Sequence, residues 1–234
     1  MEQVGVIVVA AGKGLRMGGQ VPKQHLPLAG KPVLARTLEA FEHMEQVHSV
    51  VLVVGPGDEA RCSGYIARYG LRKVHAVVTG GAERQASVYQ GLLALDPEVE
   101  WVLVHDGVRP FVTPEETAEC LAAARKHGAA VVAVPVKDTV KIVEPDGKIA
   151  STPDRSTVWA IQTPQAFRVR DLAAAHELAM RESFTGTDDA MLVERAGQAV
   201  YVVRGGYHNL KITTPEDLEW AEYRLNAMER GKDA

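Results

Sequence analysis

The chain has 234 residues, of which 46% are hydrophobic and 24% are charged. These values exclude a disordered or fibrous protein and allow one continuous α/β core. The formal net charge of -4 gives no general attraction to nucleic acid or to an anionic membrane, so a phosphate ligand would have to meet a local cluster of basic residues. Cys62 and Cys120 are the only cysteines and lie far apart, which excludes a disulfide framework and a CxxC metal or redox motif.

The first residues give no targeting signal. Residues 1–11 lack a basic region, and no apolar run approaches the roughly twenty residues that a membrane span requires. We therefore expect a cytoplasmic protein. Since no internal repeat, low-complexity tract or linker-like stretch interrupts the chain, we also expect a single domain over residues 1–234.

Short apolar runs rich in Val and Ile alternate with segments of helical period. This alternation is typical of βαβ units, and it predicts a mostly parallel, twisted, Rossmann-like α/β sheet with helices on both faces. The expected strands are residues 4–10, 50–54, 74–78, 101–105 and 129–134, and the expected helices are residues 31–47, 58–69, 83–95 and 114–127.

Two segments carry the capping signals of a helix start. Thr113-Pro114-Glu115-Glu116 supplies an N-cap, a proline at the first helical position and a capping-box acid. Thr214-Pro215-Glu216-Asp217 repeats the signal. The second segment predicts a terminal helix that ends near Arg230.

The βα alternation breaks between residues 136 and 159. Two short alternating segments there flank Glu144-Pro145-Asp146-Gly147, whose composition is typical of a tight turn. We expect a β-hairpin that protrudes from the body as an arm. An isolated hairpin is marginally stable in water, so this arm should need a surface to rest on.

A glycine-rich, basic loop, Gly12-Lys13-Gly14-Leu15-Arg16-Met17-Gly18-Gly19, follows the first expected strand. Glycines let backbone N–H groups approach a polyphosphate, and Lys13, Arg16 and Lys23 add positive charge. The P-loop pattern GxxxxGK[ST] is absent, and Met17 replaces the third glycine of the dinucleotide fingerprint. A solvated turn that closes a βα unit is the alternative, but the basic residues favour a nucleoside triphosphate site.

Six further blocks lie along nearly the whole chain. Together with the glycine loop, they are similar to the signature segments of the nucleotidyltransferase fold that activates sugars and polyols. The chain most resembles the 2-C-methyl-D-erythritol 4-phosphate cytidylyltransferase family. The blocks are PKQHLPL (22–28), GGAER with Ser87 (80–87), VHDGVRP (104–110), QTPQ (162–165), TDD (187–189) and NLKIT (209–213).

The resemblance implies an enzyme of isoprenoid precursor synthesis by the non-mevalonate pathway. It would convert CTP and 2-C-methyl-D-erythritol 4-phosphate to 4-diphosphocytidyl-2-C-methyl-D-erythritol and pyrophosphate. It implies Mg²⁺ held mainly through the CTP phosphates, and a homodimer formed through the hairpin arm. Two alternatives stay open: a ribitol-5-phosphate cytidylyltransferase that makes CDP-ribitol, and a nucleotide-binding regulator without catalysis.

The resemblance also implies roles for individual residues. Arg16, Lys23 and Lys211 are the expected catalytic cations, since they would offset repulsion between the reacting anions. No protein ligand to a metal is expected. The expected CTP-binding residues are Ala10, Ala11, Gly12, Gly14, Arg16, Lys23, Gly81 and Ser87, and the expected acceptor-binding residues are Asp106, Arg109, Thr139, Arg155, Thr187 and Lys211.

Some residues allow more than one interpretation. Asp106 and Arg109 could form a local ion pair that braces a turn instead of binding a ligand. Thr187-Asp188-Asp189 could hold a metal, or could cap a helix over residues 190–196. The family often has an acidic residue where His208 stands, and a small one where Val108 stands. At Val108 the chain resembles the ribitol-5-phosphate enzymes.

The other histidines show no paired spacing of the kind that zinc sites use, so we expect no zinc site. We expect them instead at the surface or at helix ends. They include His25, His43, His48, His75, His127 and His176.

Overall fold

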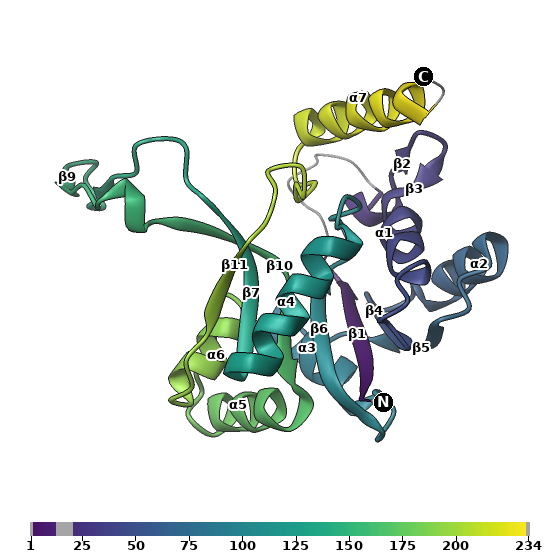
Figure 1. Ribbon diagram of the computed structural model, residues 1–234, viewed down its shortest axis with the longest axis horizontal. Helices are drawn as coiled ribbons and strands as arrows, with labels where there is room; N and C mark the ends of the chain where they lie inside the picture. The colour runs from purple at the N-terminus through teal and green to yellow at the C-terminus, as the bar shows by residue number, and fades with distance from the viewer. Residues whose placement is uncertain (1, 13–20, 233–234) are drawn as a thin grey trace.

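The computed structural model describes residues 2–12 and 21–232. The described chain forms a seven-stranded sheet with the strand order β11-β7-β10-β6-β1-β4-β5 (Figure 1). All its strands are parallel except β10, which is antiparallel to both of its neighbours. The strands are β1 (Gln3–Ala10), β4 (Ser49–Val54), β5 (Val74–Thr79), β6 (Val99–Asp106), β7 (Ala129–Pro135), β10 (Trp159–Arg168) and β11 (Tyr201–Arg204).

Helices cover both faces of this sheet because successive strand residues point to opposite faces. On β1, Val6 and Val8 pack into one apolar cluster, while Ile7 between them packs into another. The first cluster lies under α1 (Val33–Glu42), α2 (Glu59–Tyr69) and α4 (Pro114–His127). The second lies under α3 (Arg84–Leu93), α5 (Val169–Arg181) and α6 (Asp189–Arg195).

The C-terminal helix α7 (Pro215–Lys232) packs on a third, smaller cluster. Its Ala221 meets Leu28 and Phe111 there. Val108 is a member of this cluster and is 6% exposed, so its side chain belongs to the core. The nearby short elements are the 3-10 turn η2 (Lys23–His25) and the strands β2 (Pro27–Leu28) and β3 (Lys31–Pro32).

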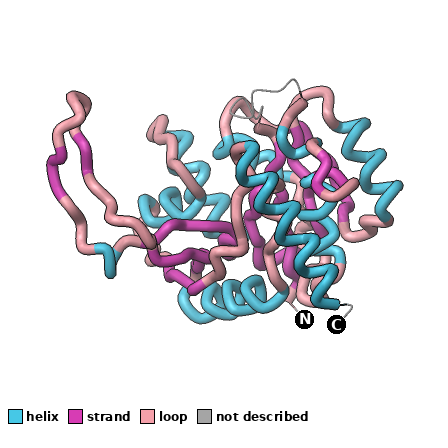
Figure 2. Tube along the Cα trace, turned by 90° about the horizontal axis from the view of Figure 1, so that it is seen from above, coloured by secondary structure: helices cyan, strands magenta, loops and turns pink. Residues whose placement is uncertain are grey.

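The hairpin arm protrudes from the body, as Figures 1 and 2 show. It contains β8 (Ile142–Val143), β9 (Ile149–Ser151) and the 3-10 turn η3 (Arg155–Thr157). Gly147 forms the turn with a φ of 90°. The apolar side chains of Ile142, Val143 and Ile149 are each more than half exposed on the arm.

The structure confirms the predicted fold class, the hairpin and all five expected strands, with small differences at their ends. The capping box of α4 is present. The Thr113 hydroxyl accepts from the Glu116 backbone N–H, and the Glu116 carboxylate accepts from the Thr113 backbone N–H. Residues 31–47 were expected to be one helix, but α1 begins only after Pro32 and ends at Glu42. Across the described ranges, we find no helix with the length and apolar character needed to cross a membrane.

Candidate functional site

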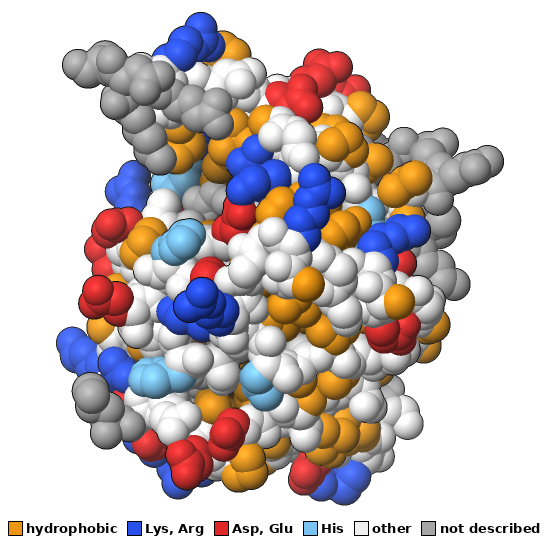
Figure 3. Space-filling view, turned by 90° about the vertical axis from the view of Figure 1, so that its right-hand side faces the viewer, with side chains coloured by type: hydrophobic (Ala, Val, Ile, Leu, Met, Phe, Trp, Pro, Cys, Tyr) orange, Lys and Arg blue, Asp and Glu red, His pale blue; other side chains and the backbone are white. Residues whose placement is uncertain are grey.

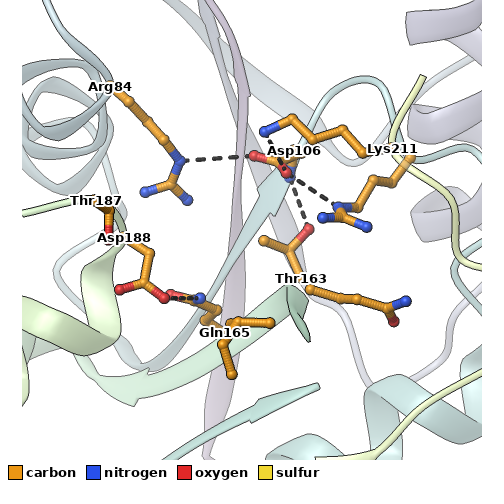
Figure 4. A pocket seen from close by; sticks show the side chains of 10 residues that line it. Arg84, Asp106, Thr163, Gln165, Thr187, Asp188 and Lys211 are labelled. Carbon is orange, nitrogen blue, oxygen red and sulfur yellow. Dashed lines mark hydrogen bonds and ion pairs between the residues drawn. The ribbon is translucent and has the colours of Figure 1, made fainter. Parts of the chain in front are cut away.

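A cavity of about 270 Å³ opens where β6, β10 and the segment before α6 meet (Figure 4). Parallel strands bring their carboxyl ends to one edge of the sheet, and open α/β folds bind ligands at that edge. Three cations and two carboxylates line the cavity. The lining residues are Arg84, Asp106, Arg109, Ile161, Gln162, Thr163, Gln165, Thr187, Asp188 and Lys211.

The carboxylate of Asp106, the last residue of β6, is the centre of the cavity's charge network. Its Oδ2 lies 3.0 Å from Lys211 Nζ and 3.1 Å from Arg109 Nε, and its Oδ1 lies 3.6 Å from Arg84 Nε. Burial alone would raise the pKa of Asp106, but Lys211, Arg84 and Arg109 together hold this pKa well below its usual range. Asp106 is therefore an anion with three cations around it, of which Lys211 and Arg109 lie closest.

Behind Asp106, a buried hydrogen-bond chain fixes the turn after β6. The Asp106 amide donates to Thr163 Oγ1 at 3.1 Å, and that hydroxyl lies 3.1 Å from His105 Nδ1. His105 Nε2 lies 3.1 Å from the carbonyl oxygen of Arg109, which can only accept. His105 is thus the Nε2–H tautomer, and its Nδ1 accepts a hydrogen bond from the Thr163 hydroxyl. Burial lowers the pKa of His105 to about 4, in agreement with a neutral ring.

The loop that carries Lys211 is tied to the rest of the site by Asn209, which is fully buried. The Asn209 backbone carbonyl accepts from Arg109 Nη1 at 2.8 Å, and the Asn209 side-chain Nδ2 donates to the backbone carbonyl of Thr163 at 2.8 Å. The Nε2 of His208, beside it, lies 3.4 Å from Glu116 Oε1, and His208 is not among the residues that line the cavity. Neither His208 nor Val108, the two positions where the sequence departs from the family pattern, lines this cavity.

Glycines keep the ends of β1 and β5 close together on the other side of the site. A Cβ on Gly80 would lie 2.6 Å from both Ala11 Cβ and Ser87 Oγ. A Cβ on Gly81 would lie 2.4 Å from Ala86 Cβ. Gln24 supports this edge, because its Nε2 donates to the carbonyls of Ala10 at 2.9 Å and Gly12 at 3.1 Å. Ser87 is 1% exposed and donates to the Glu83 carbonyl.

The structure brings only part of the expected site together in one chain. Asp106, Arg109, Thr187 and Lys211 share the cavity. Thr139 and Arg155 are exposed on the arm, where Arg155 Nη1 donates to the Lys137 carbonyl at 3.2 Å. Lys23 is half-buried in η2, next to Gln24. The expected residues Gly14 and Arg16 lie outside the described residues.

Several cavity residues were not predicted as site residues, although the sequence carried a signal for them. Arg84 belongs to the GGAER block, and Gln162, Thr163 and Gln165 belong to the QTPQ block. The family resemblance implied roles for Gly81 and Ser87 in the first block and for no residue of the second. That Arg84, Gln162, Thr163 and Gln165 line the cavity was recognisable only from the packed structure.

Two histidines correct the expectation of surface or capping roles. His25 is 8% exposed and its Nε2 lies 3.2 Å from Asp58 Oδ2. His176 is 1% exposed and its Nε2 lies 3.2 Å from Asp189 Oδ1. Each ring is buried within 3.2 Å of a carboxylate oxygen, because a buried polar group needs a polar partner.

The TDD segment caps α6. Asp188 is the N-cap, and its Oδ1 accepts from the Met191 amide at 3.0 Å. Its Oδ2 accepts from Gln165 Nε2 at 2.9 Å. Across residues 2–12 and 21–232, no group of three or more His, Cys, Asp and Glu side chains is placed to hold a metal ion. Cys62 and Cys120 are free, and burial raises the pKa of each thiol to about 12, so both stay protonated at neutral pH.

Charges on the outer surface are mixed. On the face in Figure 3, the described Lys and Arg side chains are interspersed with Asp and Glu and form no single extended basic surface. The concentrated positive charge is local to the cavity instead. A parallel sheet with one antiparallel strand, and a cation-lined cavity at its carboxyl edge, define an α/β protein of the nucleotidyltransferase class.

Comparison with known proteins identifies the family. The family model described as 2-C-methyl-D-erythritol 4-phosphate cytidylyltransferase matches residues 4–227. A protein of that name from Geobacter metallireducens is 52% identical over 221 residues, covering 92% of this chain and 94% of the relative. One from Alkaliphilus metalliredigens is 48% identical, covering 98% and 96%. The chain therefore belongs to the 2-C-methyl-D-erythritol 4-phosphate cytidylyltransferase family.

Solved structures agree with this assignment. The 4-diphosphocytidyl-2C-methyl-D-erythritol synthase of Anaerococcus prevotii superposes with a TM-score of 0.85 at 36% identity, covering 96% of this chain and 99% of that one. The 2-C-methyl-D-erythritol 4-phosphate cytidylyltransferase of Thermus thermophilus superposes with a TM-score of 0.77 at 36% identity, covering 96% and 98%.

Proposed function

We propose that the protein transfers the cytidylyl group of CTP to 2-C-methyl-D-erythritol 4-phosphate. The products are 4-diphosphocytidyl-2-C-methyl-D-erythritol and pyrophosphate, and the reaction serves isoprenoid precursor synthesis. Family membership over residues 4–227 supports this activity. The structural observation that carries it is the buried Asp106 carboxylate, with Lys211 and Arg109 at 3.0 and 3.1 Å in a cavity at the sheet edge.

The chemistry needs positioning and charge rather than a strong base. The nucleophile is a phosphate monoester with a second pKa near 6, so it is already mostly dianionic at neutral pH. The main barrier is repulsion between this anion and the triphosphate, which cations at the reacting phosphorus reduce. Lys211 is suited to this role because a compact ammonium on a flexible stem can follow charge as it moves between oxygens.

In this proposal, the acceptor occupies the cavity. Asp106 accepts a hydrogen bond from a hydroxyl group of the polyol, while Arg109 and Lys211 face the phosphate of the acceptor. Thr187 lies at the rim of the cavity. Support comes from their common place around about 270 Å³ of space. The Arg109 side chain has the firmest anchor of the three, because Asp106 and the Asn209 carbonyl both accept from it.

CTP lies along the neighbouring edge, formed by residues 10–12 at the end of β1 and by Gly81 and Ser87 after β5. The close approach of Gly80 to Ala11 and Ser87 supports a site where only small residues fit against a flat base. Gly14, Arg16 and Lys23 complete the triphosphate site in this proposal, with Arg16 and Lys23 as further catalytic cations.

We propose that Mg²⁺ arrives with CTP, held mainly by its phosphates. The described residues offer no cluster of metal ligands, and Asp106 is already shared by three cations, so they fit an ion that the substrate carries. When bound, the ion would neutralise part of the triphosphate charge. The cations of the protein would neutralise the charge of the acceptor phosphate.

We propose further that the protein works as a homodimer, with residues 1–234 as one nucleotidyltransferase domain and the arm as its dimerisation element. The arm exposes Ile142, Val143 and Ile149, each more than half exposed, and a symmetric partner would cover them. Thr139 and Arg155 lie on the same arm and outside their own cavity. In the dimer they would contact the acceptor phosphate in the partner's site.

The test is Mg²⁺-dependent pyrophosphate release from CTP, ATP, GTP and UTP with each candidate acceptor. We expect turnover with CTP and 2-C-methyl-D-erythritol 4-phosphate, and little with the other nucleotides. Equal rates with all four would refute the cytidylyl assignment, and preference for ribitol 5-phosphate would refute the acceptor. The relatives give the ribitol enzyme no support, and Val108 lies in the core instead of lining the cavity.

A further inference from the structure

Arg84 has an unusual place among the cations of the cavity. It is the first residue of α3 and reaches Asp106 from the side opposite Lys211 (Figure 4). Its Nε lies 3.6 Å from Asp106 Oδ1, too far for a strong hydrogen bond. Its Nη1 donates to Asp189 Oδ2 at 2.6 Å. Asp189, and not Asp106, therefore holds the guanidinium in place.

Asp189 is completely buried behind the cavity wall and uses both of its oxygens. Oδ2 accepts from Arg84, and Oδ1 lies 3.2 Å from Nε2 of His176, which is itself 1% exposed. Burial alone would raise the pKa of Asp189, but Arg84 and His176 keep this pKa below its usual value. A charged, buried carboxylate held from two sides gives Arg84 a fixed partner.

The segment that carries Asp189 is itself anchored. Gln165 on β10 accepts from the Ala190 amide at 3.3 Å and donates to Asp188 at 2.9 Å. His176 on α5 adds a stacked contact with Tyr89 on α3, with ring centroids 6.0 Å apart. Three helices and one strand thus fix the position of a single guanidinium.

Part of that guanidinium remains free to bind a ligand. Within the described chain, Arg84 Nη2 makes no hydrogen bond, although Arg84 lines the cavity and its side chain is 27% exposed. Burial would lower the pKa of Arg84, but Asp189 and Asp106 hold it above its usual value, so the charge persists. A charged planar group with unused N–H donors, fixed at a cavity wall, is suited to bind phosphate oxygens.

We propose that Arg84 is an additional phosphate-binding residue of this site and that Asp189, backed by His176, is its positioning residue. This inference rests on the proposed function, because it takes the ligands to be phosphate esters. Holding the guanidinium in advance reduces the side-chain entropy lost on binding. Asp189 acts only through Arg84, since it is buried and touches no ligand.

The experiment is a double-mutant cycle of Arg84→Gln, Asp189→Asn and the double variant. Binding is measured by calorimetry in two arms, which separate the two sources of phosphate. One arm titrates CTP, and the other titrates 2-C-methyl-D-erythritol 4-phosphate with a non-hydrolysable CTP analogue present. We expect Arg84→Gln to weaken binding at least about tenfold in one arm, and Asp189→Asn about fivefold in the same arm.

The double variant decides the mechanism. If Asp189 acts through Arg84, the double variant binds as Arg84→Gln does, within about twofold. If the two effects multiply, Asp189 acts on the site by another route and the positioning role is refuted. Normal binding by folded Arg84→Gln in both arms would refute the phosphate contact. Arg84→Gln alone leaves Asp189 buried without its cation, so its melting temperature should be lower than that of the double variant. Comparing the melting temperatures separates this loss of stability from a loss of binding.

A matched control is Glu182→Gln, which removes the 2.5 Å ion pair between Glu182 and Arg195 at the far end of α6. It removes a carboxylate that pairs with an arginine on α6 without touching Arg84, so we expect wild-type affinities. Pyrophosphate release by the wild type is recorded in parallel. If the wild type binds both ligands but does not turn them over, the proposed function fails, while the binding cycle still tests the inference.

Discussion

Lys211 Nζ lies 3.0 Å from Asp106 Oδ2, and this pair joins the loop before α7 to the end of β6. Arg109 uses the same carboxylate oxygen at 3.1 Å. A phosphate that enters the cavity must therefore compete with Asp106 for both cations. The carboxylate keeps the two cations beside each other and aimed at the cavity, which shortens the rearrangement that binding requires.

The first prediction concerns the two lysines that we propose to be catalytic. We expect Lys211→Ala and Lys23→Ala each to lower kcat/KM by at least about a hundredfold, on the scale of losing one group that stabilises the transition state. Pyrophosphate release measures the effect. Lys126→Ala, at an exposed position in the last turn of α4, is the control and should keep the wild-type rate. A near-normal rate in folded Lys211→Ala protein would remove Lys211 from the mechanism.

The second prediction concerns the close contact at Gly80. A methyl group there would meet Ala11 Cβ and Ser87 Oγ at 2.6 Å, so Gly80→Ala should push apart the two edges of the proposed CTP site. We expect kcat/KM for CTP to fall by about ten- to a hundredfold, mainly through KM. Gly64→Ala is the control, because Gly64 lies on α2 with nothing within 4 Å of the added methyl.

Gly64→Ala should also raise the free energy of unfolding by about 0.5–1 kcal/mol, since alanine favours a helix more than glycine does. Thermal denaturation of both variants separates a local effect on CTP binding from a loss of folding. Unchanged KM in Gly80→Ala would argue against a nucleotide at this edge.

The third prediction concerns His105 and pH. Its pKa in the folded protein is about 4, below the ordinary value of 6.5. Between these values the unfolded chain binds a proton that the folded chain does not, so this contribution to stability is complete above pH 6.5 and is lost as the pH falls toward 4. The loss should be on the order of 3 kcal/mol.

Urea denaturation at pH 7, 6, 5 and 4 measures this loss. His105→Gln cannot take up the proton and should show a flatter dependence on pH than the wild type. His43→Gln, which removes an exposed imidazole at the end of α1, controls for the loss of a histidine elsewhere. Parallel pH profiles for the wild type and His105→Gln would contradict a neutral, buried His105.

The fourth prediction tests the crossed active site of the proposed homodimer. Lys211→Ala and Arg155→Ala subunits are mixed after each is shown to be nearly inactive. If Arg155 acts in the partner's site, each mixed dimer has one doubly damaged site and one intact site. Random mixing makes about half of the dimers mixed, so activity should recover to roughly a quarter of wild type. No recovery after proven subunit exchange would show that Arg155 does not act across the dimer.

The elements that sequence patterns predicted best are those with local signals. The strand expected at residues 129–134 is observed as Ala129–Pro135, and the helix expected at 114–127 is observed with those bounds, because its N-cap, proline and capping-box acid all lie within four residues. The start of α1 was missed because β3 precedes it at Pro32. The hairpin was recognised from its turn composition, and Gly147 does take the positive φ that the turn requires.

The sequence by itself determined the alternation of strands and helices and the family, because strand period, helix capping and the blocks of the nucleotide site are all local in the chain. Only the tertiary structure decided which charges meet. Arg84 and Asp189 are 105 positions apart, yet their side chains are 2.6 Å apart behind the cavity. No local pattern specifies such a pair, since it depends on how α3 and α6 pack on the same face of the sheet. It also depends on burial, because a buried charge without a partner is costly.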